Sequence, residues 1–421
     1  MVDVLLIGSG GREHALAWKL KQSPRIGKLY IAPGNGGTRQ CGENVPIGVM
    51  EFDKLAAFAE EKNIGLTVCS MDDPLVAGVV DFFQSRGLRI WGPNKAAAQL
   101  EGSKAFSKQL MAEAGVPTAE FGVFTEYEKA LEYVQARGAP IVVKASGLAL
   151  GKGVVVAQTL DEAEHFLRAV MVDRIFKDSG NEVVIEEFLE GPEISIHALS
   201  DGESYKLFPA SQDHKRALDN DAGKNTGGMG VIAPLPFVSP ELMREIDETI
   251  VRPTLDALKR KGIEYKGILY PGLILTTKGP KVLEYNARFG DPECQVYMRL
   301  LKTDLLDLLE ATVEGTLATV PIEWNGGAAC NVVVASGGYP ENYRKGLPIL
   351  GIEAAETGGV VVFHAGTSYD GELKTSGGRV LGVSATASDL KDALAKAYAA
   401  IGKIHFEGMQ YRRDIGRKAV L

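Results

Sequence analysis

The segment Lys281-Val-Leu-Glu-Tyr-Asn-Ala-Arg-Phe-Gly-Asp-Pro-Glu-Cys-Gln295 begins with apolar and polar residues in alternation. In a strand, the apolar residues at 283, 285, 287 and 289 would share one face, and the other face would carry Glu284, Asn286 and Arg288. Such a row can hold a hard cation beside an anion, because Mg²⁺ takes oxygen ligands with substrate phosphates and Arg grips carboxylates and phosphates. An antiparallel strand with one solvated face gives the same pattern, so spacing leaves both interpretations open.

Composition limits the classes of protein to which the chain can belong. It has 421 residues, 45% hydrophobic and 24% charged, which is typical of a globular protein of about two to four domains. A net charge of −8 without a basic cluster argues against nucleic acid as the main partner. Four scattered cysteines favour reduced thiols over a zinc site or disulfides. Without a signal peptide or membrane-length apolar run, we expect a cytoplasmic protein with no membrane segment. We also expect a monomer or small homo-oligomer.

The N-terminal part alternates strand and helix patterns, which predicts a parallel, doubly wound sheet. The strands are expected at residues 2–7, Lys28–Ala32, Gly65–Cys69 and Arg89–Trp91. The first strand runs into Gly8-Ser-Gly-Gly-Arg-Glu-His14, in which Gly8-x-Gly10 would place backbone N–H groups at a helix N-terminus that suits an anion such as phosphate.

A dinucleotide site does not fit this turn. The third glycine of G-x-G-x-x-G would fall at Glu13, and the second strand ends in Ala32-Pro33-Gly34 without an acid for a ribose. A phosphate or phosphosugar site and a purely structural turn remain as interpretations.

A compact α+β unit follows, with strands at Phe121–Phe124, Pro140–Lys144 and Val154–Ala157 and a helix at Glu126–Arg137. Lys144 ends an apolar strand and would be costly to bury without an anionic partner. The Gly147–Gly153 loop after it can close over phosphates, although Gly153 rules out a Walker P-loop. A hairpin with an exposed lysine is the alternative. Lys104, at a helix start, could equally extend to solvent.

The second half of the chain contains an acidic hinge, a long polar loop and a β-rich tail. At the hinge, Glu186-Glu187-Phe-Leu189-Glu-Gly-Pro-Glu193, free backbone groups could read a purine edge; solvated glutamates are the alternative. Residues 211–230 have no periodicity and predict a functional loop. Beyond them we expect helices at Ser239–Lys261, Leu300–Glu314 and Ser388–Ile401, a hairpin at Gly267–Thr276 and Lys281–Arg288, and strands at Ala328–Ser336, Val360–Ala365 and Arg379–Ser384. The tail from about Gly326 is expected to be structural support.

Several segments, in this order, resemble the ATP-grasp ligases and, within them, the phosphoribosylamine–glycine ligase family of purine biosynthesis. The resemblance is carried by Val4–Ala15, Leu100–Phe106, Lys144–Val154, Gln212–Arg216, Asn225–Gly230 and Arg288–Gln295. It implies an α/β and α+β multidomain fold: a doubly wound pre-ATP-grasp domain at 1–101, an ATP-grasp domain at 102–325 with a lid at 123–190, and a C-terminal β-rich domain at 326–421.

The resemblance also implies roles for particular residues. For ATP it implies contacts from Lys104, Lys144, Gly151, Lys152, Gly153, Glu186, Glu187, Leu189 and Glu193. It implies that Glu284 and Asn286 hold Mg²⁺ or Mn²⁺, that Asp213 and Arg288 orient glycine, and that Gly8, Gly10, Gly11 and Arg12 hold the phosphate of phosphoribosylamine. Catalysis would fall to Arg288, Lys144 and Asp213. Many ATP-grasp enzymes add a metal-binding acid on the preceding strand, which Tyr270–Thr276 lacks.

The implied reaction joins glycine to 5-phosphoribosylamine through glycyl phosphate, with ATP converted to ADP and phosphate. The alternatives are an ATP-grasp ligase for another carboxylate or amine, a nucleotide-binding sensor without turnover, and an NAD-dependent oxidoreductase. Retention of Lys104, Lys144, Glu284 and Asn286 argues against the sensor.

Overall fold

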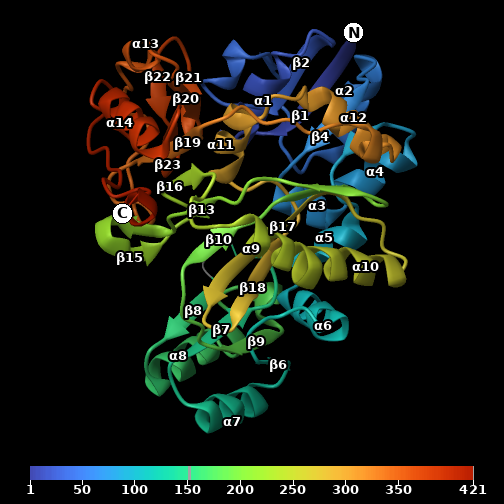
Figure 1. The fold of residues 1–421 in the computed structure, drawn as a ribbon, viewed down its shortest axis with the longest axis vertical. Helices are drawn as coiled ribbons and strands as arrows, with labels where there is room; N and C mark the ends of the chain where they lie inside the picture. The colour runs from blue at the N-terminus through green and yellow to red at the C-terminus, as the bar shows by residue number, and fades with distance from the viewer. Residues whose placement is uncertain (150–152, 421) are drawn as a thin grey trace.

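The computed structural model describes residues 1–149 and 153–420 of the chain. The expected ATP contacts at Gly151 and Lys152 lie outside the described residues. An upper body contains the N-terminal and C-terminal parts side by side, and a smaller lobe projects below it (Figure 1). In the described part of the chain, no helix is both long enough and apolar enough to cross a membrane.

The N-terminal part is a parallel sheet, as predicted. Its strands are β1 (Val2–Gly8), β2 (Ile26–Pro33), β3 (Glu43–Asn44), β4 (Leu66–Cys69) and β5 (Ile90–Trp91), in the order β3-β2-β1-β4-β5. Helices α1 (Gly11–Leu20), α2 (Phe52–Glu61), α3 (Asp72–Ala77) and α4 (Val79–Ser85) connect them. The strand order reverses between β1 and β4. In doubly wound sheets, ligands bind beyond the carboxyl ends of the strands at this switch point, where residues 8–12 lie.

The lower lobe is a separate antiparallel sheet with two covering helices. Its strands β6 (Phe121–Phe124), β7 (Ile141–Ala145), β8 (Val154–Ala157) and β9 (Val183–Glu187) have the order β6-β9-β7-β8. Helices α7 (Tyr127–Arg137) and α8 (Leu160–Met171) bury residues such as Val134 and Leu167 against it. Helices α5 (Lys95–Gly102) and α6 (Lys104–Ala114) lead into the lobe, and Ser103 caps α6 by accepting a hydrogen bond from the Phe106 N–H.

The central sheet contains the alternating residues of the segment Lys281–Gln295. It has β10 (Glu193–Ser195), β11 (Ala198–Asp201), β12 (Tyr205–Leu207), β17 (Lys266–Thr276) and β18 (Gly279–Asn286). The predicted alternation holds from Glu284 onward, but Leu283 does not share the buried face. A bulge shifts the register, so that Leu273 pairs with Val282 and Gly272 with Glu284. The bulge turns Leu283 toward the cavity described below, and β18 ends at Asn286, before Arg288.

The third sheet joins distant parts of the chain. Strands β13 (Gln212–Asp213) and β16 (Gly230–Ala233) pair in the order β13-β16-β19-β23-β20 with β19 (Ala328–Ala335), β23 (Arg379–Ala387) and β20 (Val361–His364). Helix α14 (Leu390–Ile401) packs on it, and a hairpin, β21 (Thr367–Tyr369) and β22 (Leu373–Thr375), lies beside it. The prediction of an irregular loop at 211–230 was wrong. The segment also contains a hairpin, β14 (Arg216–Leu218) and β15 (Ala222–Asn225), because backbone pairing does not require an apolar period.

Two predicted helices are interrupted. The helix expected at Leu300–Glu314 begins only at Leu305, as α12 (Leu305–Glu314), and a separate helix α11 (Glu293–Leu300) precedes it. The break occurs because the Asp304 carboxylate accepts the Leu306 N–H and begins a new helix. The helix expected at Ser239–Lys261 consists of α9 (Pro240–Ile246) and α10 (Arg252–Arg260), separated by a π-helical turn at Asp247–Val251. Pro253 follows that turn and has no N–H to donate into a regular helix.

Buried polar contacts join the N-terminal and C-terminal sheets. His14 Nδ1 accepts a hydrogen bond from the His364 N–H at 2.7 Å, and their rings meet edge to face with centroids 5.4 Å apart. Burial lowers the pKa of His364 to about 4 and that of His14 well below its usual value. Both rings are therefore neutral at pH 7.

These neutral histidines should make the fold sensitive to acid. Because unfolded histidine titrates near pH 6.5, the unfolded chain binds more protons between pH 6.5 and 4, and stability is lost as pH falls through that window. We expect His364→Gln to reduce the slope of unfolding free energy against pH by up to about 1.4 kcal/mol per pH unit between pH 6 and 5. Denaturant unfolding of the wild type and of each variant at several pH values measures the slope. The exposed His405→Gln variant is the control, and equal slopes in all three proteins would refute the expectation.

Candidate active site

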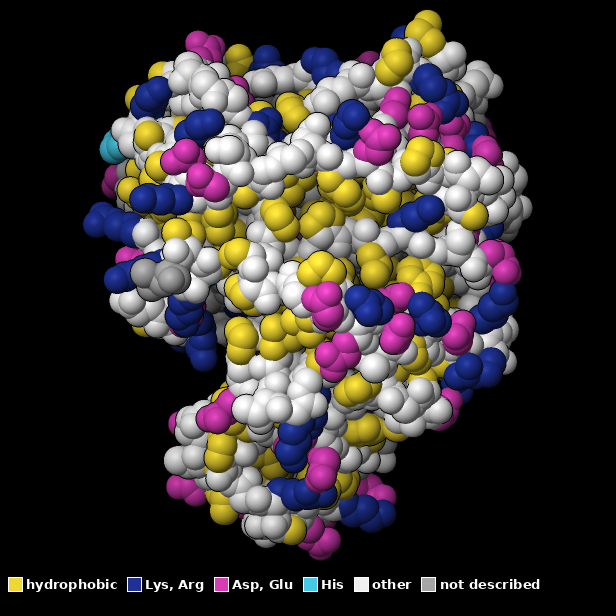
Figure 2. Space-filling model, viewed as in Figure 1, with side chains coloured by type: hydrophobic (Ala, Val, Ile, Leu, Met, Phe, Trp, Pro, Cys, Tyr) yellow, Lys and Arg dark blue, Asp and Glu magenta, His cyan; other side chains and the backbone are white. Residues whose placement is uncertain are grey.

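A cavity of about 1250 Å³ lies where the lower lobe, the central sheet and the two upper sheets meet. Figure 2 shows the lower lobe set off from the upper body by a recess on this face. Of the predicted site residues that the structure describes, all except Gly8 and Gly11 line the cavity, and these two belong to the loop that forms its N-terminal wall. Segments far apart in sequence are therefore brought to one place.

A buried ion-pair chain lies beneath the lower lobe. Glu186 Oε1 is 2.9 Å from Lys144 Nζ, and Glu186 Oε2 is 3.2 Å from Lys108 Nζ. Lys144 Nζ also donates to the Leu283 carbonyl at 3.0 Å. Lys144 thus has the anionic partner that its burial requires. The Glu186 side chain forms ion pairs with both lysines. Sequence reasoning missed Lys108, although it lies four residues after Lys104 and therefore on the same helix face.

Burial governs the protonation of the lysines on α6. It lowers the pKa of Lys108 to about 8 despite the neighbouring Glu186 carboxylate. It also lowers the pKa of Lys104, against the attraction of Glu284. Lys104 Nζ donates to the Gly147 carbonyl at 3.3 Å, so this lysine points along the loop after β7 and not to solvent. The arrangement would place added negative charge, such as a phosphate, between Lys104 and Lys144.

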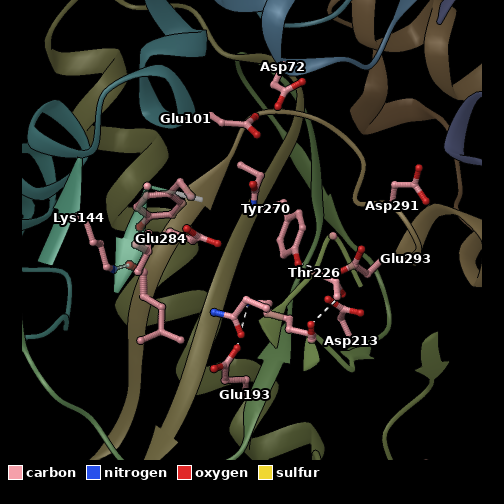
Figure 3. A pocket seen from close by; sticks show the side chains of 18 of the residues that line it. Asp72, Glu101, Lys144, Glu193, Asp213, Thr226, Tyr270, Glu284, Asp291 and Glu293 are labelled. Carbon is pink, nitrogen blue, oxygen red and sulfur yellow. Dashed lines mark hydrogen bonds and ion pairs between the residues drawn. The ribbon is translucent and has the colours of Figure 1, made fainter. Parts of the chain in front are cut away.

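Glu284 is a second carboxylate of the cavity and lies in the same region as Lys144 (Figure 3). Burial raises its pKa, but Lys215, Lys144 and Lys104 outweigh burial, and the net pKa is lower than usual. Glu284 is therefore ionised. Asn286, on the same face, accepts a hydrogen bond from Arg288 Nη2 at 3.1 Å.

Glu284 and Asn286 supply too few oxygen ligands to bind a hard cation alone, but they suit one that a bound nucleotide also ligates. Among residues 1–149 and 153–420, no group of three or more His, Cys, Asp or Glu side chains could hold a metal ion. One ionised carboxylate and one amide oxygen match the way in which Mg²⁺ is held, with substrate phosphates and water filling the remaining positions. Glu284 and Asn286 therefore fit a metal that arrives with a nucleotide.

Arg288 has only part of its hydrogen-bonding capacity satisfied. Its Nη2 is 2.8 Å from Glu101 Oε1, and its Nη1 donates to the Phe289 carbonyl at 3.2 Å. Its Nε is buried and has no hydrogen-bond partner in the described part of the chain. An unpartnered donor on a buried guanidinium favours an anionic ligand such as a carboxylate. Sequence reasoning missed Glu101, which is 187 positions away and gives no local signal.

A second acidic group lies on the other side of the cavity. Asp213 and Glu293 lie close together in Figure 3, and Glu293 Oε1 accepts hydrogen bonds from the hydroxyls of Tyr270 and Ser195. Burial and Glu293 raise the pKa of Asp213 well above its usual value. Asp213 Oδ1 has no hydrogen-bond partner among the described residues. The pair can take up a cation or a proton, and Glu293 was not predicted.

The hinge residues have more internal contacts than the sequence suggested. The Glu187 N–H donates to the Glu120 carbonyl at 2.9 Å, and its carboxylate is 2.9 Å from Lys281 Nζ. Glu193 Oε2 is 3.0 Å from Lys215 Nζ. Leu189 lines the cavity. Gly153 also lines it, and a Cβ there would meet the Ala149 side chain.

The Gly8–Arg12 loop does not present free donors in the way the sequence suggested. The Gly10 N–H donates to Glu13 Oε2 at 2.8 Å. Arg12 Nε is 2.6 Å from Glu13 Oε1, and its Nη1 donates to the Phe289 carbonyl at 3.0 Å. Glu13, which breaks the dinucleotide motif, thus takes the place of an external anion at the start of α1.

The C-terminal part does more than support the fold. Arg379 Nη1 donates to the carbonyls of Gly227 and Asp291, at 2.5 and 2.6 Å, and the Tyr339 hydroxyl accepts the Gly227 N–H at 3.1 Å. Both side chains line the cavity. Sequence reasoning missed Arg379, because a single polar residue on a strand far along the chain gives no local signal of a site.

Comparison with known proteins places this site in a family. Residues 2–101, 102–294 and 329–418 match the N domain, the ATP-grasp (A) domain and the C domain of phosphoribosylglycinamide synthetase, respectively. The chain is 49% identical to phosphoribosylamine–glycine ligase of Caldanaerobacter subterraneus, over 98% of this chain and 99% of the relative. It is also 49% identical to the enzyme of that name from Chlorobaculum tepidum, over all of both chains.

Solved structures agree with this assignment. The crystal structure of phosphoribosylamine–glycine ligase from Thermotoga maritima aligns with a TM-score of 0.86 and 35% identity, over 98% of this chain and 100% of that one. A biotin carboxylase domain from Hydrogenobacter thermophilus shares the fold, with a TM-score of 0.74 at 17% identity, over 97% of this chain and 91% of that one. The chain is a ligase of the ATP-grasp fold and belongs to the phosphoribosylamine–glycine ligase family.

Proposed function

We propose that this protein joins glycine to 5-phosphoribosylamine, forming glycinamide ribonucleotide while ATP is converted to ADP and phosphate. The observation that carries the proposal is the ionised Glu284 facing Lys104 and Lys144 in the cavity that Arg288 and Asp213 also line. It provides a place for a nucleotide and its metal beside a place for a small carboxylate with an amine. The proposal divides the chain at 101/102 and 325/326, with 123–190 as the lid, and leaves the molecule a monomer or small homo-oligomer.

The first step activates glycine. Its carboxylate oxygen attacks the γ-phosphorus of ATP, an O–P bond forms, the bond to the bridging oxygen breaks, and ADP leaves. Lys104 and Lys144 would stabilise the phosphates, with Gly153 beside them and Glu186 holding Lys144 in place. Glu187 and Leu189 would contact the adenine through their main chain, and Glu193 would contact the ribose. The unpartnered Arg288 Nε would receive the glycine carboxylate, and Asp213 its amine. Positioning and charge neutralisation supply the rate enhancement.

The second step forms the amide. The amine of phosphoribosylamine attacks the carbonyl carbon of glycyl phosphate, a C–N bond forms, the C–O bond to phosphate breaks, and the nitrogen loses a proton. The amine would approach from the Gly8–Arg12 loop at the switch point. Closure of the lower lobe would exclude water, which otherwise hydrolyses the acyl phosphate.

Glu284 and Asn286 would hold Mg²⁺ or Mn²⁺. The metal would supply neutralisation of phosphate charge when bound. Glu284 also opposes the lowering of the Lys104 pKa by burial.

Phosphate release tests the proposed function directly. We expect release from ATP only when glycine and freshly generated phosphoribosylamine are both present, with glycinamide ribonucleotide formed in equal amount. Release with another carboxylate but not glycine would favour a different ATP-grasp ligase. An absence of release under all conditions would favour a nucleotide sensor.

Glu284→Gln tests the charge at the centre of the site. Because the substitution keeps the shape but removes the carboxylate charge, we expect kcat to fall by about 10²–10³-fold with an unchanged melting temperature. Steady-state kinetics and thermal unfolding measure the two effects. Glu407→Gln, which alters an exposed pair with Arg344, is the matched control. A parallel loss of melting temperature and activity would instead indicate a structural role for the strand.

A further inference from the structure

The wall of the main cavity that carries Asp213 is in contact with a segment near the C-terminus. This wall consists of residues 213–227, with Asp213 at its start and the hairpin β14–β15 within it. The C-terminal segment, defined here as residues 412–418, lies beside the hairpin, and Figure 1 shows the C-terminus next to β15. Lys418 of this segment also lines the cavity.

The C-terminal segment holds the turn of the hairpin through a buried arginine. The Arg412 side chain is 1% exposed, and its Nη1 is 2.8 Å from Asp221 Oδ1 in the turn. Its Nε and Nη2 are each 2.8 Å from the two carboxylate oxygens of Asp414. Asp414 Oδ2 accepts the Asn220 N–H at 2.8 Å. Because the arginine–carboxylate contact is bidentate and charge-assisted, it fixes the turn more firmly than a single neutral hydrogen bond would.

His214 makes a second connection, directly beside Asp213. Its Nδ1 is 3.1 Å from the Gly230 carbonyl oxygen, and its Nε2 is 3.0 Å from the Gly416 nitrogen. A carbonyl only accepts and a backbone N–H only donates, so Nδ1 carries the proton and Nε2 accepts. Burial and Arg412 lower the pKa of His214 to about 4. The ring is therefore neutral at pH 7, and Nε2 is free to accept.

The backbone of His214 is held as closely as its ring. The His214 N–H donates to the Gly230 carbonyl at 2.9 Å, and the His214 carbonyl accepts the Met229 N–H at 2.8 Å. Space beside the neighbouring carboxylate is small, since a Cβ at Gly228 would lie 2.5 Å from Asp213 Oδ1. The position of the Asp213 carboxylate therefore depends on where His214 is held.

We propose that His214 is a positioning residue for glycine: through its bond to Gly416, the C-terminal segment fixes the Asp213 carboxylate where it meets the glycine amine. The inference rests on the proposed function. It gives residues 412–418, which are far along the chain from the ATP-grasp part, a role in binding the amino acid. The ring acts through Asp213 and does not need to touch the substrate.

Two substitutions at His214 separate its two ring contacts. Asn keeps a donor near the Nδ1 position but is too short to reach Gly416, whereas the Gln side-chain oxygen can reach the Nε2 position and accept the Gly416 N–H. We expect His214→Asn to raise the KM for glycine about tenfold and to leave the KM for ATP within about twofold. His214→Gln should stay within about threefold of the wild type for both substrates. Equal glycine KM values in the two variants would overturn the inference, as would an equal rise in the KM for ATP.

A substitution in the turn tests the other connection of the C-terminal segment. Asp221→Asn removes the charge that pairs with Arg412, so we expect a rise in the glycine KM of about threefold or more. Glu341→Gln is the matched control, because it alters an exposed pair with Lys224 on the same hairpin without involving the C-terminal segment. Identical glycine KM values in these two variants would count against the inference.

Hydrogen–deuterium exchange gives a readout that does not need turnover. The amides of residues 214–226 should exchange faster in His214→Asn than in the wild type and in His214→Gln, while β6 and β9 of the lower lobe keep wild-type rates. Unchanged exchange in His214→Asn would overturn the inference. If the exchange rates differ as expected but the wild type neither binds glycine nor releases phosphate with it, the proposed function fails and the connection from the C-terminal segment to Asp213 stands.

Discussion

A buried carboxylate among cations is the constraint on which the site depends. Glu284 is ionised because Lys215, Lys144 and Lys104 outweigh its burial. Two of these cations have a further carboxylate behind them, Glu186 for Lys144 and Glu193 for Lys215. Removing Glu186 would leave the buried Lys144 charge without its direct ion-pair partner, at a cost of several kcal/mol. The alternation of charge therefore holds β7, β18 and the segment after β13 in a fixed arrangement, and directs positive charge into the cavity.

The same network couples the lower lobe to the central sheet. The Lys144 side chain extends from β7 of the lower lobe and donates a hydrogen bond to the Leu283 carbonyl, which belongs to the bulge in β18. A regular strand would have placed Leu283 on the buried face. The bulge thus moves one residue of the strand to the cavity side while leaving Glu284 and Asn286 there. Bulges often redirect side chains beside active sites in this way.

The third sheet explains why the C-terminal part reaches the site. Its strands β13 and β16 come from the middle of the chain, and β19, β23 and β20 come from the end. The peptide after β13 and the Arg379 side chain on β23 therefore lie against each other. The buried contacts of His14 and Asn35 with His364 complete the connection to the N-terminal sheet. Residues from all three parts therefore line the main cavity.

The sequence by itself determined the local features: the parallel N-terminal sheet, β6 and β8 to the residue, and the polar face that carries Glu284 and Asn286. These depend on periodicity and turn residues, which act over a few positions. Only the tertiary structure decided the bulge at Leu283, the pairing of Arg288 with Glu101 and of Lys108 with Glu186, and the presence of Arg379 in the site. It also decided that the Glu13 carboxylate accepts the hydrogen bond of the Gly10 N–H. Each of these outcomes depends on which charged or hydrogen-bonding groups meet after folding, and partners distant in sequence leave no local pattern from which that meeting can be predicted.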